Sequence, residues 1–106
     1  MVIRGEIWLV NLDPTVGSEI RKARPCVVVS PAEMHDHLRT VIVAPMTTGS
    51  RAAPFRIDVT HAGREGLILL DQLRSVYKTR LAKKLGAVSA KTLTATMNVL
   101  QEVFAE

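Results

Sequence analysis

The sequence is poor in cysteine and in aromatic residues. It contains one cysteine, one tryptophan, one tyrosine and two phenylalanines among 106 residues. A lone cysteine excludes an intramolecular disulfide, and the apolar neighbours of Cys26 predict a small buried strand residue rather than a reactive thiol. So few rings disfavour a broad platform on which nucleic-acid bases stack. We expect Trp8 and Phe104 to belong to the core.

Long apolar runs and targeting signals are also missing. No run approaches the roughly 18 apolar residues that indicate a membrane-spanning helix. The first residues lack the charged-then-apolar layout of a signal peptide. Because the length suits one domain, we expect a single cytoplasmic domain over residues 1–106, with no membrane contact.

The composition describes a globular chain with a mild basic bias. Hydrophobic residues make up 47% and charged residues 23%, so a packed core is expected rather than disorder. A core in a domain of this size is modest, and pairing with a second copy would bury more surface. Fourteen Lys and Arg against ten Asp and Glu give a net charge of +4, which favours an anionic partner such as nucleic acid.

The pattern of apolar residues predicts several short strands followed by one helix. Strands are expected near residues 6–12, 27–29, 40–44, 55–59 and 67–70, and the second and third are continuous apolar runs with both faces covered. Leu93, Met97, Leu100 and Phe104 then recur at helical spacing, so a helix is expected over 90–104 with Ser89 as its N-cap. This order predicts a mainly β protein: a small, strongly bent antiparallel barrel with a C-terminal helix.

The segment between the first two strands holds most of the candidate chemistry. A loop this long in a small domain is functional or disordered. It carries three cations together with a serine and a glutamate: Arg21, Lys22, Arg24, Ser18 and Glu19. On composition alone, a solvated basic loop is favoured, because charge runs usually face water.

A histidine-rich segment is a candidate metal site. His35, Asp36 and His37 place three potential ligands together. Because no second Cys or His cluster completes a closed site, a surface loop is the favoured interpretation, with a short helix inside 31–38 as an alternative. We expect neither a metal nor another cofactor.

Four motifs together point to a family. Residues 13–19 read Asp-Pro-Thr-Val-Gly-Ser-Glu and lead to Arg24-Pro25 and an apolar strand. Residues 5–8 read Gly-Glu-Ile-Trp, 43–48 read Val-Ala-Pro-Met-Thr-Thr, and 70–76 read Leu-Asp-Gln-Leu-Arg-Ser-Val. In this order and spacing the set resembles the MazF/PemK/Kid family, which are ribosome-independent endoribonuclease toxins of bacterial toxin–antitoxin systems.

The resemblance implies roles for particular residues. Arg24 and Thr47 match the catalytic arginine and threonine of MazF-type members, and Glu19 is a candidate base or a group that orients Arg24. The Kid-like branch instead uses a histidine and an arginine where this chain has Ser18 and Leu69, so the MazF-type set fits better. The residues expected to bind RNA are Ser18, Arg21, Lys22, Thr48, Asp71, Gln72, Arg74, Lys78 and Arg80.

The implied reaction is metal-free cleavage of single-stranded RNA or mRNA. The ribose 2′-OH attacks the adjacent phosphate and leaves a 2′,3′-cyclic phosphate and a 5′-OH, so DNA is not a substrate. A guanidinium suits the crowded phosphorane, and because guanidinium groups hold their protons tightly, Arg24 is better placed as a stabiliser than as a proton donor. Without the resemblance, Thr47 would be read as a simple hydroxyl at a strand end.

The resemblance also implies partners and a fold. It implies an SH3-like barrel of the CcdB/PemK type, a homodimer, and a cognate MazE-like antitoxin whose acidic, partly disordered tail covers the basic groove. Two rival functions remain. One is a CcdB-like toxin that binds gyrase and cuts nothing, and the other is a non-catalytic RNA-binding module.

Overall fold

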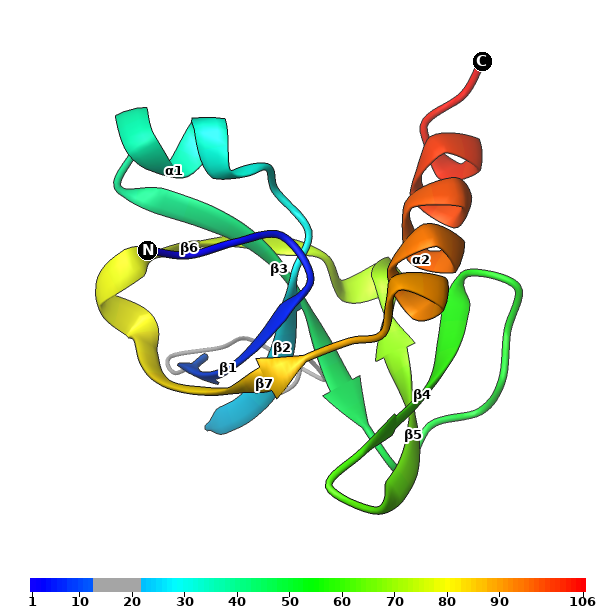
Figure 1. Cartoon of the computed structure of the whole chain (residues 1–106). Coiled ribbons are helices and arrows are strands. Elements are labelled where there is room, and N and C mark those ends of the chain that lie inside the picture. Colours follow the sequence, from blue (N-terminus) through cyan, green and yellow to red (C-terminus); the bar gives the residue numbers. More distant parts are fainter. Residues whose placement is uncertain (13–21) are drawn as a thin grey trace.

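One curled antiparallel sheet forms most of the protein (Figure 1). The computed structural model describes residues 1–12 and 22–106. The sheet has the strand order β4-β5-β3-β2-β1-β7, and β6 pairs with β3 outside this path. In chain order the elements are β1 (Glu6–Asn11), β2 (Ala23–Val28), α1 (Ala32–His37), β3 (Thr40–Thr47), β4 (Arg56–His61), β5 (Arg64–Leu69), the short 3-10 helix η1 (Leu70–Gln72), β6 (Arg74–Tyr77), a second 3-10 helix η2 (Lys78–Arg80), β7 (Leu81–Ala87) and α2 (Ala90–Val103).

The strand β3 has three partners along its length, and this makes the sheet curl. Its first residues, 40–43, pair with β6, while 43–45 pair with β2. Met46 and Thr47 then pair with Ile68 and Leu67 of β5. Because the neighbours change along one strand, the sheet bends into a half-barrel, and α2 packs beside β4 (Figure 1). The predicted mainly β, bent fold with a C-terminal helix is confirmed.

Side chains from both faces of β2 and β3 are buried in two separate clusters. Val27 and Ala44 belong to one cluster, together with Ile7, Ile68 and Leu100. Cys26, Val28, Val41 and Val43 belong to the other, with Val10, Leu12 and Val76. This explains why these strands are continuous apolar runs, because a strand with one solvent-exposed face would alternate apolar and polar residues. Burial of Cys26 raises the pKa of its thiol to about 12, as expected for an inert structural cysteine.

The helix α2 begins at its predicted N-cap. The Ser89 hydroxyl accepts a hydrogen bond from the Thr92 backbone N–H at 3.1 Å, which satisfies one of the free donors of the first turn. Leu100 is buried, but the placement of Phe104 in the core was wrong, because its side chain is 73% exposed. The helix ends at Val103 and Phe104 is the C-cap, so helical spacing no longer directs its side chain toward the sheet.

A buried carboxylate ties the N-terminal strand to the edge strand β7. Glu6 is 6% exposed and accepts hydrogen bonds from the Ile3 backbone at 2.8 Å and from the Trp8 indole at 3.1 Å. Lys84 forms an ion pair with the same carboxylate at 2.7 Å. Burial by itself would raise the pKa of Glu6, but these partners outweigh it and lower the pKa. The Gly-Glu-Ile-Trp motif is therefore structural.

Two strands were not predicted from the sequence, and the segment around His35 is a helix rather than the favoured surface loop. The two strands are β6 and β7. β6 has only four residues, and β7 reads Leu-Ala-Lys-Lys-Leu-Gly-Ala, which does not alternate between apolar and polar residues. The pairing of β7 with β1 also contains two register shifts. The segment around His35 is the helix α1, which confirms the alternative of a short helix inside 31–38, and the favoured interpretation of a surface loop was wrong. His35 is 3% exposed, with its Nε2 2.5 Å from the Ser30 hydroxyl and its Nδ1 2.9 Å from the Val2 carbonyl.

The described part of the chain contains neither a metal-binding cluster nor a helix that could span a membrane. Within residues 1–12 and 22–106, no group of three or more His, Cys, Asp or Glu side chains is arranged to hold a metal ion. No helix in that part of the chain is long and apolar enough to cross a membrane.

Candidate active site

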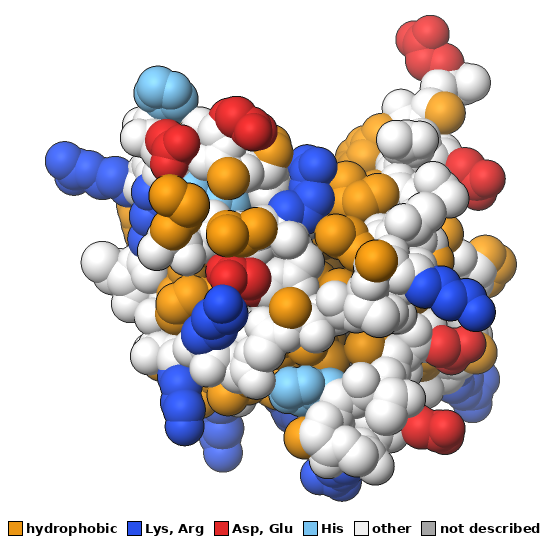
Figure 2. Space-filling view, in the orientation of Figure 1, with side chains coloured by type: hydrophobic (Ala, Val, Ile, Leu, Met, Phe, Trp, Pro, Cys, Tyr) orange, Lys and Arg blue, Asp and Glu red, His pale blue; other side chains and the backbone are white. Residues whose placement is uncertain are grey.

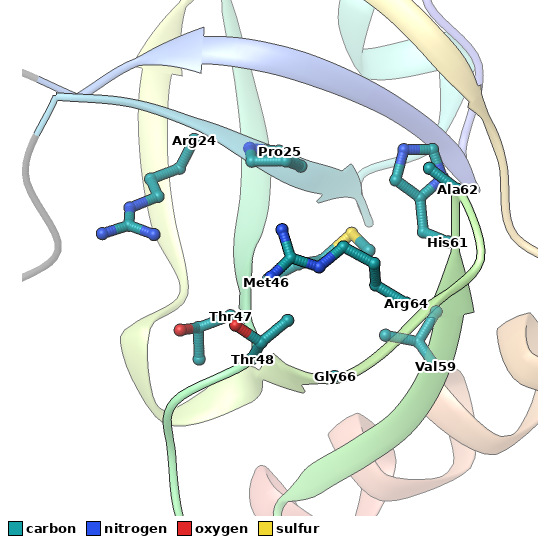
Figure 3. Close-up of a pocket in the computed structure, with 10 residues that line it drawn as sticks. All are labelled: Arg24, Pro25, Met46, Thr47, Thr48, Val59, His61, Ala62, Arg64 and Gly66. Carbon is teal, nitrogen blue, oxygen red and sulfur yellow. The ribbon is translucent and has the colours of Figure 1, made fainter.

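A pocket of about 350 Å³ opens between β2, the end of β3 and the hairpin formed by β4 and β5 (Figure 3). It contains both catalytic candidates that lie in the described part of the chain, Arg24 and Thr47. Its remaining lining residues are Pro25, Met46, Thr48, Val59, His61, Ala62, Arg64 and Gly66.

The strand register explains why Arg24 and Thr47 meet here. Cys26 of β2 lies opposite Pro45 of β3, and the same antiparallel register continued by two residues places Arg24 opposite Thr47. The two strands no longer pair with each other at this point, although on their outer edges Arg24 still pairs with Val10 of β1 and Thr47 pairs with Leu67 of β5. The strands separate, and the pocket fills the space between them (Figure 3).

The Thr47 backbone is held by a close approach from β5. A Cβ atom at Gly66 would lie 2.7 Å from the Thr47 carbonyl oxygen, closer than such atoms pack, so only glycine fits without a shift of one strand. The Thr47 hydroxyl accepts a hydrogen bond from the Gly49 backbone at 3.3 Å, and its own hydrogen is left to donate to a ligand. Thr47 is therefore fixed at both its backbone and its side chain.

The hairpin of β4 and β5 supplies the opposite wall of the pocket. Its two turn residues, Ala62 and Gly63, have φ of 53° and 76°, as in the tight turns that match the twist of paired strands. His61 lies directly opposite Arg64 in the ladder, and both are on the face that carries Val59 and Gly66. In Figure 3 the side chain of Arg64 extends over the pocket toward Met46.

The contribution of this hairpin to the pocket was not predicted from the sequence. A signal was present, because Ala-Gly separates the alternating segment that ends near His61 from the apolar run that begins at Leu67. Pairing across that turn brings His61 and Arg64 to the same face. The sequence does not show that this face of the hairpin lies across the pocket from Thr47.

Other residues expected to bind RNA lie away from this pocket. Arg74 and Arg80 line a second pocket of about 310 Å³ beside the exposed Tyr77, and Arg80 also donates to the Asn11 carbonyl at 3.1 Å. Lys78 donates to the backbone carbonyl of His35, which anchors α1. Figure 2 shows Lys and Arg side chains spread around this view rather than gathered in one stripe, so net charge does not mark the site.

The remaining predicted residues have structural surroundings or lie outside the described part. Asp71 forms a two-fold hydrogen-bonded ion pair with Arg56, at 3.1 and 3.0 Å, and this lowers the pKa of the Asp71 carboxyl. Gln72 is half-buried in η1. Lys22 is exposed, and its carbonyl accepts from the Leu12 N–H at 3.1 Å. Three predicted residues lie outside the described residues: Ser18, Glu19 and Arg21.

A sequence model of the family described as "PemK-like, MazF-like toxin of type II toxin-antitoxin system" matches residues 3–104. The chain belongs to this family. The toxin is 35% identical over 106 residues to "Endoribonuclease PemK" of Escherichia coli, which covers 94% of this chain and 80% of the relative. It is 36% identical over 100 residues to "Endoribonuclease toxin MazF" of Escherichia coli (strain K12), over 91% of this chain and 90% of the relative.

Solved structures agree with this assignment. The crystal structure of MazF (Form-I) from Deinococcus radiodurans superposes with a TM-score of 0.83 at 27% identity, covering 96% of this chain and 94% of that one. The predicted family, the predicted fold and the predicted enzyme class, an endoribonuclease toxin, are confirmed.

Replacing Gly66 by Ala is expected to damage both stability and cleavage. The new Cβ meets the Thr47 carbonyl, so β3 and β5 must move apart and Thr47 leaves its position. We expect a loss of about 1–3 kcal/mol in unfolding free energy, measured in urea, with strongly reduced RNA cleavage. Gly49→Ala is the matched control, because a Cβ there meets no atom within 4 Å. Equal behaviour of the two variants would contradict this account of Gly66.

Replacing Asp71 by Asn is expected to remove a stabilising effect that depends on pH. Arg56 lowers the pKa of Asp71 below the ordinary 3.8, so in acid the unfolded chain binds more protons than the folded one. The toxin should exceed the variant in unfolding free energy at neutral pH, and this gap should close as pH falls below about 4. Urea unfolding across that range measures the gap. Asp58→Asn, at an exposed position, is the control. A gap that does not change with pH would refute the ion-pair explanation.

Proposed function

We propose that this toxin cleaves single-stranded RNA, including mRNA, at short recognition sequences by metal-independent transesterification in the pocket that contains Arg24 and Thr47. One observation carries the proposal: these two side chains line the same cavity although 23 positions separate them in sequence. The toxin acts in the cytoplasm, where its substrate is found, and cleavage of mRNA arrests growth.

The reaction needs three contributions from the protein: a base, a source of a proton for the leaving oxygen, and donors that stabilise the phosphorane. A base takes the proton from the ribose 2′-OH, whose oxygen attacks phosphorus. The bond from phosphorus to the 5′ oxygen breaks, and that oxygen takes a proton. Between these events the phosphorane carries extra negative charge, which preorganised donors stabilise. The products are a 2′,3′-cyclic phosphate and a 5′-OH, and DNA is not cut because it lacks the nucleophile.

Arg24 and Thr47 suit the stabilising task. The Arg24 guanidinium offers several donors in one plane, which match two oxygens of a phosphate. The Thr47 hydroxyl accepts from Gly49 and donates its hydrogen to a non-bridging phosphate oxygen. Glu19, which lies outside the described residues, is the candidate for the base at the 2′-OH.

The other predicted RNA-binding residues extend the substrate path in this proposal. Thr48 lines the catalytic pocket itself, while Arg74 and Arg80 line the second pocket beside β6. Asp71 and Lys78 support this path indirectly. Asp71 is paired with Arg56, and Lys78 is hydrogen-bonded to the backbone of α1. The remaining residues of the path are Ser18, Arg21, Lys22 and Gln72. Binding of RNA by the Lys and Arg side chains of this path weakens as salt concentration rises.

We also propose a homodimer and a MazE-like antitoxin as partners. Related structures are described as "MazE-MazF (Form-II) from Deinococcus radiodurans" and as an endoribonuclease "in complex with its cognate antitoxin from Mycobacterial species". The toxin exposes Val103 and Phe104 at the end of α2, and a second copy would cover this apolar surface. An acidic antitoxin segment that folds on binding suits a basic catalytic pocket.

Cleavage in the presence of EDTA tests the proposed function. Purified antitoxin-free toxin is incubated with a long single-stranded RNA and its DNA counterpart, and the product ends are mapped. We expect discrete RNA cuts with 2′,3′-cyclic phosphate and 5′-OH ends, intact DNA, and at least a hundredfold lower rate for Arg24→Ala. Arg24→Lys, which keeps the charge but loses the planar fork, should recover only part of the rate. Intact RNA with folded toxin would support a gyrase-binding or non-catalytic alternative, and full activity of Arg24→Ala would remove Arg24 from the mechanism.

The hydroxyl of Thr47 gives a second, independent prediction. Thr47→Val keeps the shape of the side chain and removes its donor, so we expect a loss of about ten- to a hundredfold in cleavage rate. Thr47→Ser keeps the hydroxyl and should stay close to the parent. The measurement is the single-turnover rate on a short RNA that contains one mapped site. Parent-like cleavage by Thr47→Val would leave Thr47 with a structural role only.

A further inference from the structure

The pocket that contains Arg24 and Thr47 is larger and more apolar than a phosphate requires. Its volume of about 350 Å³ lies in the range of small-molecule sites. In Figure 3 Arg24 and Thr47 lie toward one end of the pocket, and the backbone of Arg64 lies toward the other. The lining also includes Pro25 and Met46, whose side chains have no donor for a phosphate. Part of the pocket therefore remains for another part of the substrate.

A planar cation reaches over this apolar part of the pocket. Arg64 is the first residue of β5, and its side chain extends over the pocket toward Met46 (Figure 3). Arg64 is exposed, and no hydrogen bond or ion pair joins its side chain to another described residue. Glu65, the acidic residue next to it in sequence, lies opposite Thr60 and so belongs to the other face of the hairpin. The Arg64 guanidinium is thus available to a ligand.

A flat guanidinium above apolar side chains is suited to a nucleobase. Every base has a flat π face, and the planes of arginine side chains stack on unpaired bases of RNA. The positive charge adds a cation–π attraction to the same face. No Phe, Tyr or Trp is among the described residues that line this pocket, and the His61 ring is turned toward Gly86 of β7 (Figure 3). Arg64 is therefore the flat group that a base in this part of the pocket would meet.

We propose that the apolar part of this pocket binds one nucleobase of the RNA beside the scissile phosphate, stacked between the Arg64 guanidinium and the side chains of Pro25 and Met46. This inference rests on the proposed endoribonuclease function and adds a base-binding subsite to it. Phosphate and base of one nucleotide are separated only by the ribose, so a phosphate held by Arg24 and Thr47 brings an adjoining base to the same pocket. Stacking tolerates any base, so Arg64 determines how firmly the nucleotide is held rather than which base it carries.

Removal of the base from the substrate tests this subsite. Once a cleavage site is mapped, two further RNAs carry a stable abasic ribose on the 5′ or the 3′ side of the cut, with the phosphates and the 2′-OH retained. For the parent toxin, one of these two RNAs should have a kcat/KM about ten- to a hundredfold below that of the natural RNA. For Arg64→Ala, removal of the same base should cost at least about fivefold less than it costs the parent.

Two control variants separate stacking from charge. Arg64→Lys keeps the positive charge and loses the flat guanidinium, so it should resemble Arg64→Ala in the comparison of natural and abasic RNA. Arg39→Ala makes the same change at an exposed arginine that does not line the pocket, and it should keep the parent's dependence on the base. The Kd values of the same RNAs with a 2′-deoxyribose at the cut measure the effect without cleavage. Urea unfolding checks that each variant is folded.

The inference and the proposed function fail in different ways. If the parent cuts both abasic RNAs within about twofold of the natural RNA, the pocket takes no base and the inference is wrong. An equal loss for Arg64→Ala on natural and abasic RNA, or full recovery by Arg64→Lys, would assign Arg64 to a phosphate and overturn the stacking role. If the folded parent cuts no RNA, the proposed function itself fails, because no cleavage site then exists beside which a base could bind.

Discussion

The pairing of β3 with three other strands is the constraint on which the rest of the structure depends. A strand in a flat sheet keeps the same two neighbours, whereas β3 exchanges β6 for β5 along one edge between Thr40 and Thr47, with β2 on its other edge. This exchange curls the sheet and buries apolar side chains on both faces of its centre, in two clusters. The ladder between β2 and β3 ends after Pro45, so on the β2 edge the following residues face a cavity instead of a neighbouring strand.

The pocket that contains Arg24 and Thr47 is therefore a product of the curl of the sheet. Arg24 continues in β2 beside β1, and Thr47 continues in β3 beside β5, so both side chains stand on regular strands whose backbones are hydrogen-bonded. Gly66 permits the close contact of β5 with Thr47 that completes this arrangement. Side chains on strands are positioned more narrowly than side chains on free loops, which suits a reaction that depends on donors placed before the charge develops.

Charged residues divide between support of the scaffold and the pocket. Lys84 and Arg56 are paired with Glu6 and Asp71, and Lys78 holds the α1 backbone. These contacts explain part of the Lys and Arg content without any reference to RNA. Arg24 and Arg64 instead line the cavity from opposite walls. A net charge of +4 is thus a poor guide to the site, because the location of each cation and its partner decides whether it can meet a phosphate.

The sequence by itself determined the strands from β1 to β5, the helix α2 with its Ser89 cap, and the family through its ordered motifs, because periodicity and capping are local properties. It missed β6 and β7, whose short or exposed segments carry little hydrophobic pattern, and it placed Phe104 in the core although helix geometry ends one residue earlier. Only the tertiary structure decided that Arg24 and Thr47 share a pocket with His61 and Arg64, while Asp71 and Lys78 are held by other groups. The reason is physical: the register and the curl of the sheet bring these side chains together, and both arise from contacts between residues far apart in the chain.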